Sequence, residues 1–293
     1  MSDPRLYQIA TLASLLVYGM GWLDFDIGPA RASLLLLTAL ATQAAGDRLT
    51  GSRFNPKSAL ISGLSLCLLL RTNRPDVAVL AAVVTIAGKF IVRVGGKHIF
   101  NPTNGGIVAM MLLTNDVWVS PGQWGSAAFF ACLMACAGGI VVNRAARADV
   151  TYAFIAFYAA LVFGRSIYLG EPLTIPLHRL ESGALLLFTF FMISDPKTTP
   201  DSRAGRVLFA GLVAFGAWYV QFRLFRTNGL LWSLAVCSVA VPLIDRVLPG
   251  RRYDWNTVSN HKGHEGKAVP LRVPSFVSLV SFVVNVFFQR SAT

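Results

Sequence analysis

The chain has 293 residues, of which 54% are hydrophobic and only 14% are charged, and its mean hydropathy is +0.57. Because a soluble domain carries about 25% charged residues, this composition excludes an ordinary soluble protein and predicts a polytopic membrane protein. The formal net charge of +12 would suit a nucleic-acid-binding protein, but the positions of the basic residues argue against that class, as described below.

Ten apolar stretches are predicted to form the membrane elements of an all-α protein. Several of them fall below the usual ~20 residues of a spanning helix. They cover residues 8–24, 28–45, 57–70, 76–94, 104–114, 124–143, 149–168, 182–194, 204–224 and 228–247. We therefore expect one transmembrane domain over residues 1–247 and a cytoplasmic tail over 248–293. The tail contains an amphipathic apolar segment, 274–289, which is expected to lie in the membrane interface or to pack on the helices rather than to cross.

The basic residues predict the orientation. If the N-terminus is cytoplasmic and every element crosses, 18 of the 26 basic residues lie on the cytoplasmic side and six lie outside. The cytoplasmic set is Arg5, Arg48, Arg53, Lys57, Lys89, Arg93, Lys97, Arg144, Arg147, Lys197, Arg203, Arg206, Arg246, Arg251, Arg252, Lys262, Lys267 and Arg272. This bias follows the positive-inside rule and predicts an N-in, C-in protein of a bacterial-type inner (plasma) membrane. The basic excess is then explained by topology, and no nucleic-acid partner is expected.

Two of the apolar runs are too short to cross a membrane and end in polar loops. One runs over 183–193 and stops at Ser194-Asp195-Pro196, and the other runs over 105–113 and stops at Asn115-Asp116. Shifted by 79 residues, the second loop falls on the first, and the topology places the two loops on opposite sides. Paired broken helices of this kind point to a binding site near the membrane midplane in proteins built from inverted repeats. We therefore predict two inverted repeats, with their broken elements around 104–126 and 182–206.

Four sequence motifs can be read together. They are Asn101-Pro-Thr-Asn104 followed by Gly105-Gly106, Pro121-Gly122-Gln-Trp-Gly125, SGALLLFTFFMISDPKTTP at 182–200, and Pro242-Leu-Ile-Asp245. This set resembles the RnfD/NqrB family, whose members are RnfD of the Rnf electron-transport complex and NqrB of the sodium-pumping NADH:quinone reductase. The resemblance implies a bundle of about ten helices in two inverted repeats, similar to urea and ammonium channels. It also implies flavin binding, with FMN attached covalently to a threonine within Ser-Gly-Ala-Thr in the best-known members.

The chain departs from this family pattern at the attachment sequence. No Ser-Gly-Ala-Thr occurs in it, and the loop between Asn115 and Pro121 is too short for the family's extra segment. We therefore expect any FMN or riboflavin to be bound non-covalently, and we do not expect covalent FMN.

The candidate cofactor-binding residues lie at the ends of the short helices, where unpaired backbone groups are available. Glycines there allow a ring or a phosphate to approach the backbone, while amides and hydroxyls offer neutral hydrogen bonds. The set is Asn101, Thr103, Asn104, Gly105, Gly106, Gly122, Gly125, Ser182, Gly183, Ser194, Asp195, Lys197 and Thr198. Asp195 is either a functional charge or an anchor that bonds nearby backbone N–H groups. Asp245 is expected to form a structural pair with Arg246, and the sequence predicts no catalytic group and no metal ligand.

Two functions of different classes remain open from the sequence. In the first, the protein is a membrane subunit of an electron-transport system that binds flavin or quinone non-covalently, couples to ion or electron movement and works with other subunits. In the second, it is a channel or transporter for a small polar or flavin-like solute on the same inverted-repeat scaffold. The family motifs favour the first, and the missing attachment sequence favours the second.

Overall fold

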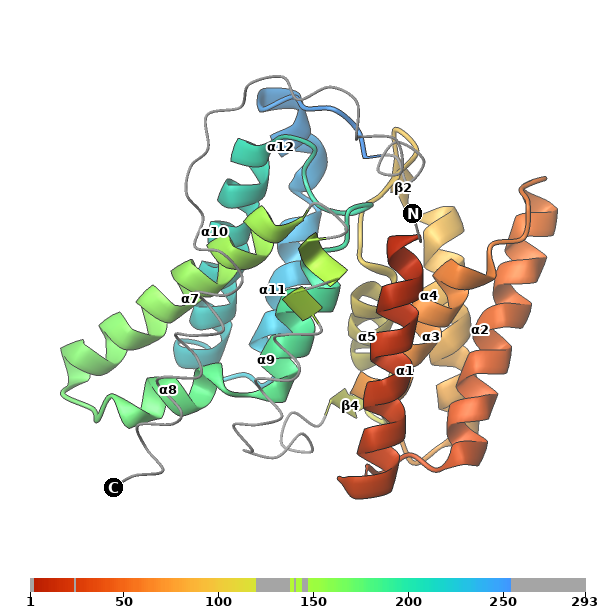
Figure 1. Cartoon of the computed structure of the whole chain (residues 1–293), viewed down its shortest axis with the longest axis horizontal. Coiled ribbons are helices and arrows are strands. Elements are labelled where there is room, and N and C mark those ends of the chain that lie inside the picture. The colour runs from red at the N-terminus through yellow and green to blue at the C-terminus, as the bar shows by residue number, and fades with distance from the viewer. Residues whose placement is uncertain (1–2, 24, 120–137, 140, 144–146, 254–293) are drawn as a thin grey trace.

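The computed structural model describes residues 3–23, 25–119, 138–139, 141–143 and 147–253, and this part of the chain is mainly helical (Figure 1). Five helices make up the described part of the N-terminal half. They are α1 (Pro4–Trp22), α2 (Pro29–Leu49), α3 (Pro56–Leu69), α4 (Pro75–Ile91) and α5 (Pro102–Leu113). Each has a proline in its first turn, where the missing N–H leaves no intrahelical hydrogen bond unmade. Helix α2 packs on α3 and α4, α1 packs on α3, and α4 packs on α5.

The C-terminal half is assembled around a long central helix, α10 (Arg203–Phe222), which packs between α7 (Ala148–Leu169) and α11 (Gly229–Ser238). The other elements are α8 (Thr174–Leu180), α9 (Gly183–Leu187), the π-helical turn η2 (Phe188–Met192) and α12 (Val241–Val247). The largest fully buried side chains of this half come from α7, η2 and α10, namely Phe154, Phe188, Phe190 and Phe209.

Two short antiparallel strand pairs close the ends of the molecule. Strand β1 (Leu70–Arg71) pairs with β4 (Trp118–Val119), and β2 (Arg93–Val94) pairs with β3 (Lys97–His98). The β2–β3 hairpin turns through Gly95 and Gly96, whose φ values are +56° and +77°. Two consecutive residues with positive φ match the tight type I′ hairpin turn, which glycine adopts without steric cost.

Nine of the ten predicted apolar stretches coincide with helices in the described residues. The tenth, 124–143, and the tail beyond 253, including 274–289, fall largely or wholly outside them. Helix α8 was not predicted, because Pro172 and Pro176 interrupt its apolar pattern. The predicted stretch 228–247 is two helices, α11 and α12, bent by 50°.

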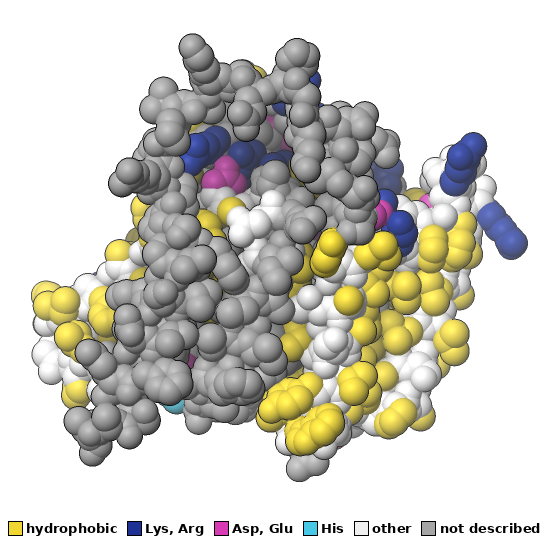
Figure 2. All heavy atoms as spheres, viewed as in Figure 1, with side chains coloured by type: hydrophobic (Ala, Val, Ile, Leu, Met, Phe, Trp, Pro, Cys, Tyr) yellow, Lys and Arg dark blue, Asp and Glu magenta, His cyan; other side chains and the backbone are white. Residues whose placement is uncertain are grey.

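Helices α7 and α10 are long and apolar enough to cross a membrane, and the bent pair α11–α12 makes a third candidate if it forms one span. Helix α3, helix α5 and the segment Gly183–Met192 are shorter apolar helices. Large hydrophobic side chains such as Leu37 of α2 and Ile167 of α7 are exposed on the outside. Figure 2 shows hydrophobic side chains spread along the helices, while Lys and Arg gather at the end where α1 begins. These features support an integral membrane protein.

Candidate functional site

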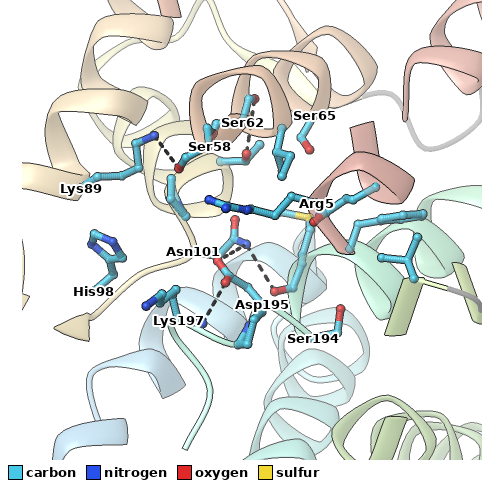
Figure 3. A pocket seen from close by; sticks show the side chains of 18 of the residues that line it. Arg5, Ser58, Ser62, Ser65, Lys89, His98, Asn101, Ser194, Asp195 and Lys197 are labelled. Atoms are coloured by element: carbon cyan, nitrogen blue, oxygen red, sulfur yellow. Dashed lines mark hydrogen bonds between the residues drawn. The ribbon is translucent and has the colours of Figure 1, made fainter. Parts of the chain in front are cut away.

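The start of α5 and the end of η2 meet at the side chain of Asn101, which lies beside Asp195 (Figure 3). Asn101 caps α5, because its side-chain oxygen accepts a hydrogen bond from the backbone N–H of Asn104 at 3.1 Å. The Nδ2 of Asn101 donates to the carbonyl of Met192 and to Oδ2 of Asp195, both at 3.3 Å. Two motifs more than 90 residues apart in sequence are thus joined by one amide side chain.

The polar loop after η2 turns tightly around Asp195. The carboxylate Oδ1 accepts the backbone N–H of Lys197 at 3.0 Å, and the Asp195 carbonyl accepts the N–H groups of Thr198 and Thr199 at 3.1 Å. Burial is the main reason that the pKa of Asp195 lies above its ordinary value, although the Lys197 backbone bond and the charges of Lys197 and Lys89 oppose this rise. The preceding residues, 188–192, form a π-helical turn, a rare feature that occurs frequently at functional sites.

A cavity of about 250 Å³ lies between this loop and the starts of α1, α3 and α5. Polar side chains form much of its wall. Ser58, Ser62 and Ser65 of α3 line it, and their spacing places all three on one helix face. Asn101 and Asp195 face them from the other side of the cavity (Figure 3). Irregular backbone at membrane depth is tolerated where it lines a cavity of this kind.

Basic groups surround this cavity. Lys89 is only 5% exposed, and its Nζ donates to Oγ of Ser58 at 3.1 Å. Arg5 extends into the cavity from α1 (Figure 3) and is paired with Asp3 at 2.8 Å. The hydrogen bonds from Arg5 and Lys57 outweigh the effect of burial and hold the pKa of Asp3 well below its usual range.

His98, on strand β3, lines the same cavity. Burial, together with the charges of Arg93, Lys89 and Lys197, lowers its pKa to about 4. The imidazole is therefore neutral at pH 7 and lies in a strongly positive field.

Sequence reasoning did not select Lys89, His98 or the three serines of α3 as site residues. Lys89 was counted only for topology, although it is the one charged residue in the apolar run 77–90, and a charge in such a run marks a functional candidate. The helical spacing of Ser58, Ser62 and Ser65 was likewise readable from the sequence.

The structure separates the predicted site residues into groups. Five of them line the cavity: Asn101, Thr103, Ser194, Asp195 and Lys197. Thr198 is buried beside it and donates to the Asp195 carbonyl. Ser182 and Gly183 begin α9 at the other end of the bundle, and Gly122 and Gly125 lie outside the described residues.

The remaining predicted residues, Asn104, Gly105 and Gly106, are in the first turns of α5. Gly106 lies against α4 so closely that an added Cβ would meet Oγ1 of Thr85 at 1.8 Å, and a Cβ on Gly105 would meet Cβ of Phe100 at 2.9 Å. These two glycines therefore serve the packing of the helix. Asn104 is fully buried.

Asp245 has partners other than the expected Arg246. Its Oδ2 accepts from Nζ of Lys97 at 2.8 Å, and its Oδ1 accepts from the backbone N–H of Asp201 at 2.8 Å. Lys97 also pairs with the Asp201 carboxylate at 2.9 Å. The role is structural, as expected, but the bonds join α12 to the β2–β3 hairpin rather than to its own helix.

A second cavity, of about 890 Å³, lies at the opposite end of the bundle. Ser182 and Asn228, at the starts of α9 and α11, line it together with Leu69 at the end of α3. The hydroxyl of Tyr158 donates to Oε1 of Gln221 at 3.0 Å in its wall. Met192 lines both cavities, so that they approach each other at the end of η2.

Residues 113–254 match the model of the NQR2, RnfD, RnfE family. Among curated proteins, the chain is similar to the D subunit of the ion-translocating oxidoreductase complex of Escherichia coli O9:H4, with 28% identity over 119 residues, 40% of this chain and 34% of that protein. The same component of Erwinia tasmaniensis is 29% identical over 118 residues, 40% of this chain and 33% of the relative. That of Shigella boydii is 27% identical over 139 residues, 47% of this chain and 35% of the relative.

The chain thus matches about a third of the length of these curated relatives. The family match contains the 190–200 segment that carries the most specific motif, whereas the Asn101–Gly106 motif lies before it. The resemblance expected from the motifs is confirmed: residues 113–254 match the NQR2, RnfD, RnfE family model, and the chain is similar to D subunits of the ion-translocating oxidoreductase complex.

Proposed function

We propose that this protein is a membrane subunit of an electron-transport system of the Rnf type, and that the cavity between Asn101 and Asp195 holds a flavin non-covalently. The observation that carries the proposal is the meeting of the α5 cap, the Asp195 loop and the serine face of α3 around one polar cavity. The relatives are D subunits of an ion-translocating oxidoreductase complex, and this supports a function together with other electron-transport subunits.

The side chains of this cavity fit the edge of a flavin ring, which alternates hydrogen-bond donors and acceptors. Asn101 offers both kinds of group, the serine hydroxyls can donate or accept, and Asp195 accepts. A bound flavin would supply electron transfer, and the positive charge of Lys89 would favour an anionic form of it.

A quinone is the second ligand class that this cavity could hold. Its two carbonyls only accept hydrogen bonds, so the Asp195 carboxylate would gain no partner from it. The mixed donors and acceptors of the cavity therefore favour the flavin.

The scaffold that we propose is an inverted repeat in an N-in, C-in topology. Helices α3 and α5 begin at the first cavity, whereas α9 and α11 begin at the second, so the two pairs run in opposite directions. Both α4–α5 and α10–α11 also pack a glycine against a hydroxyl side chain, Gly106 against Thr85 and Gly216 against Ser233.

Cysteine labelling tests the topology. Arg203 and Asn115 are both exposed, and they follow the Asp195 loop and helix α5 respectively. In a cysteine-free background, Arg203→Cys should react with a membrane-impermeant reagent only from the cytoplasm and Asn115→Cys only from outside. Reaction of both from the same side would contradict the inverted arrangement.

Denaturation tests the mode of flavin binding. After purification and acid precipitation, flavin fluorescence should stay in the supernatant, and the full-length band in a gel should not fluoresce. A fluorescent band at the full-length mass would show covalent attachment. A precipitate and supernatant both without flavin, from cells supplied with riboflavin, would contradict the proposal.

A solute transporter is the alternative, and the sharing of Met192 between the two cavities favours it. Cavities at opposite ends that meet at one side chain are what alternating access requires. In proteoliposomes, a transporter would take up riboflavin, and Met192→Trp would stop the uptake by filling the point of contact. Flavin that stays bound through purification, with no uptake, supports the electron-transport role instead.

A further inference from the structure

An apolar groove lies on the outside of the molecule between α7 and α10, two helices that pack along each other (Figure 1). It has a volume of about 860 Å³, and most of its lining is apolar, with Phe157 from α7 and Val207, Leu208, Gly211 and Leu212 from α10. The four larger side chains are exposed, and both helices are long and apolar enough to cross a membrane. In a membrane, a groove on such helices is open to lipid rather than to water.

Gly211 accounts for the hollow. A Cβ added there would lie 3.4 Å from the ring of Phe157, an ordinary contact distance, so the missing side chain leaves open space beside that ring. Arg203, Val207 and Gly211 follow each other at intervals of four residues and therefore share one face of α10. The groove thus runs along α10 from Gly211 back to Arg203, which also lines it.

The length of the groove matches one leaflet of a bilayer. Arg203 and Leu212, the first and last residues of α10 that line it, are separated by about 14 Å along the helix axis at ~1.5 Å per residue. The hydrocarbon core of a bilayer is about 30 Å thick, so one leaflet fills about 15 Å of it. An acyl chain from the leaflet on the side of the Asp195 loop therefore has the length of the groove, with its headgroup at Arg203.

Positive charge at the start of α10 is available for that headgroup. Arg203 is exposed and forms no ion pair within the described residues, whereas Arg206, one turn further on, is paired with Asp149 at 2.6 Å. Among the residues that the structure describes, no acidic side chain lines the groove. The first turn of a helix adds partial positive charge of its own, and Ala204, in this turn, also lines the groove. A phosphate group is the anion expected beside such a helix start.

We infer that this groove is a binding site for an anionic phospholipid, with one acyl chain along Val207 and Gly211 and the lipid phosphate at Arg203. Basic residues beside spanning helices recognise such headgroups. The apolar segment 274–289 of this chain is a poorer occupant, because it contains no Asp or Glu to pair with Arg203. The groove lies on the outside of the bundle, so this inference goes beyond the proposed function and does not depend on flavin binding.

The test is native mass spectrometry of the full-length protein in detergent, titrated separately with phosphatidylglycerol and with phosphatidylcholine, whose net charge is zero. One phosphatidylglycerol should bind about fivefold more tightly, the effect of one arginine near an anionic headgroup. Arg203→Gln should remove this preference. Arg48→Gln, which removes an exposed arginine from the end of α2, is the matched control and should keep it.

Filling the groove tests the position of the acyl chain. Gly211→Leu should weaken the binding of both lipids at least about tenfold, because about two buried methylene groups contribute that much. Gly164→Leu on α7 is the control and should change neither affinity, since an added Cβ there meets nothing within 4 Å. If Gly211→Leu does not fold, Arg203→Gln decides the inference by itself.

A photoreactive benzoylphenylalanine in place of Leu208, which is 48% exposed in the groove, identifies the occupant in native membranes. We expect cross-links to phosphatidylglycerol, seen as the mass of that lipid added to the protein, and their loss in Arg203→Gln. A cross-link to residues 274–289 or to another polypeptide would overturn the inference. Equal binding of the two lipids, or an equal loss of preference in Arg203→Gln and Arg48→Gln, would overturn it as well.

Discussion

The helix pairs α4–α5 and α10–α11 share one mode of packing, but their second helices, α5 and α11, begin differently. In both pairs, a glycine on one helix lies against a hydroxyl side chain of the other. Helix α5, however, begins at Asn101, whose side chain caps the helix and also bonds Asp195. Helix α11 begins at Asn228, which has a φ of +59° and whose side chain makes no capping bond among the described residues. Helix α5 therefore begins at the small polar cavity, whereas α11 begins at the larger cavity at the other end of the bundle.

The largest effect on stability is expected from Gly106→Ala. Its new Cβ would meet Oγ1, Cβ and Cα of Thr85 at 1.8, 2.8 and 2.9 Å, so the backbones of α4 and α5 must separate. Gly216→Ala would instead meet the Oγ of Ser233 at 2.4 Å, a side-chain atom that can rotate away. We expect Gly106→Ala to cost about 1–3 kcal/mol and Gly216→Ala distinctly less, measured as thermal unfolding in detergent.

Gly88→Ala is the control for these substitutions, because an added Cβ there meets nothing within 4 Å. Adding Ser233→Ala to Gly216→Ala should restore stability, whereas adding Thr85→Ala to Gly106→Ala should not. Equal losses for the two alanine variants would contradict the different packing of the two pairs.

The largest effect on binding is expected from Asp195→Asn. The substitution keeps the shape of the side chain but removes the charge and places a second amide opposite Asn101. Flavin affinity should fall by about tenfold or more, the loss of one or more hydrogen bonds to a charged group, while the amount of folded protein is unchanged. Flavin fluorescence titration measures the affinity. Stability and affinity falling together would mean that Asp195 is only a loop anchor.

The pH dependence of stability gives a smaller effect with a definite sign. Because the pKa of Asp195 is raised in the folded protein, the folded state binds its proton more tightly than the unfolded state. The Asp195 contribution to stability therefore falls as pH rises from its ordinary pKa of 3.8 through the raised value. Asn does not titrate, so the unfolding temperature of Asp195→Asn minus that of the unchanged protein should increase as pH rises across that window. A difference that is constant with pH would contradict the burial of the charge.

The smallest effect on stability and flavin affinity is expected from Asp116→Asn, at the end of the helix bundle opposite the Asp195 loop. Asp116 pairs with Arg74 at 3.2 Å, and both side chains are about half exposed. An exposed pair of this kind contributes about 0–1 kcal/mol, so neither stability nor flavin affinity should change measurably in the same assays. A loss of affinity equal to that of Asp195→Asn would show that the two ends have not diverged in role.

The sequence predicted the helix boundaries well where a proline begins a helix, as at Pro56, Pro75 and Pro102. It did not predict α8, because Pro172 and Pro176 interrupt the apolar pattern of this short helix, which is stabilised by its neighbours. The Asn101–Asp195 contact could only be suggested, since the two residues are 94 positions apart and no local pattern joins them.

The inverted repeat predicted from the loops of Asp116 and Asp195 stays a prediction. The close contact of Gly106 with Thr85 could not be predicted, because it joins two different helices. Lys89 was interpreted as a topology signal, although its place at the end of an apolar helix also brings it to the cavity. These positions depend on tertiary packing, which periodicity along one chain does not contain.

The visible absorption spectrum of the purified protein, recorded beside that of Asn101→Ala, tests the central claim most directly. Asn101 joins the α5 cap to the Asp195 loop, so the flavin should be held where both motifs meet. We expect flavin absorption bands in the unchanged protein and their loss in Asn101→Ala, with both proteins folded. Flavin bands of equal strength in the two proteins would place the flavin elsewhere and contradict the account.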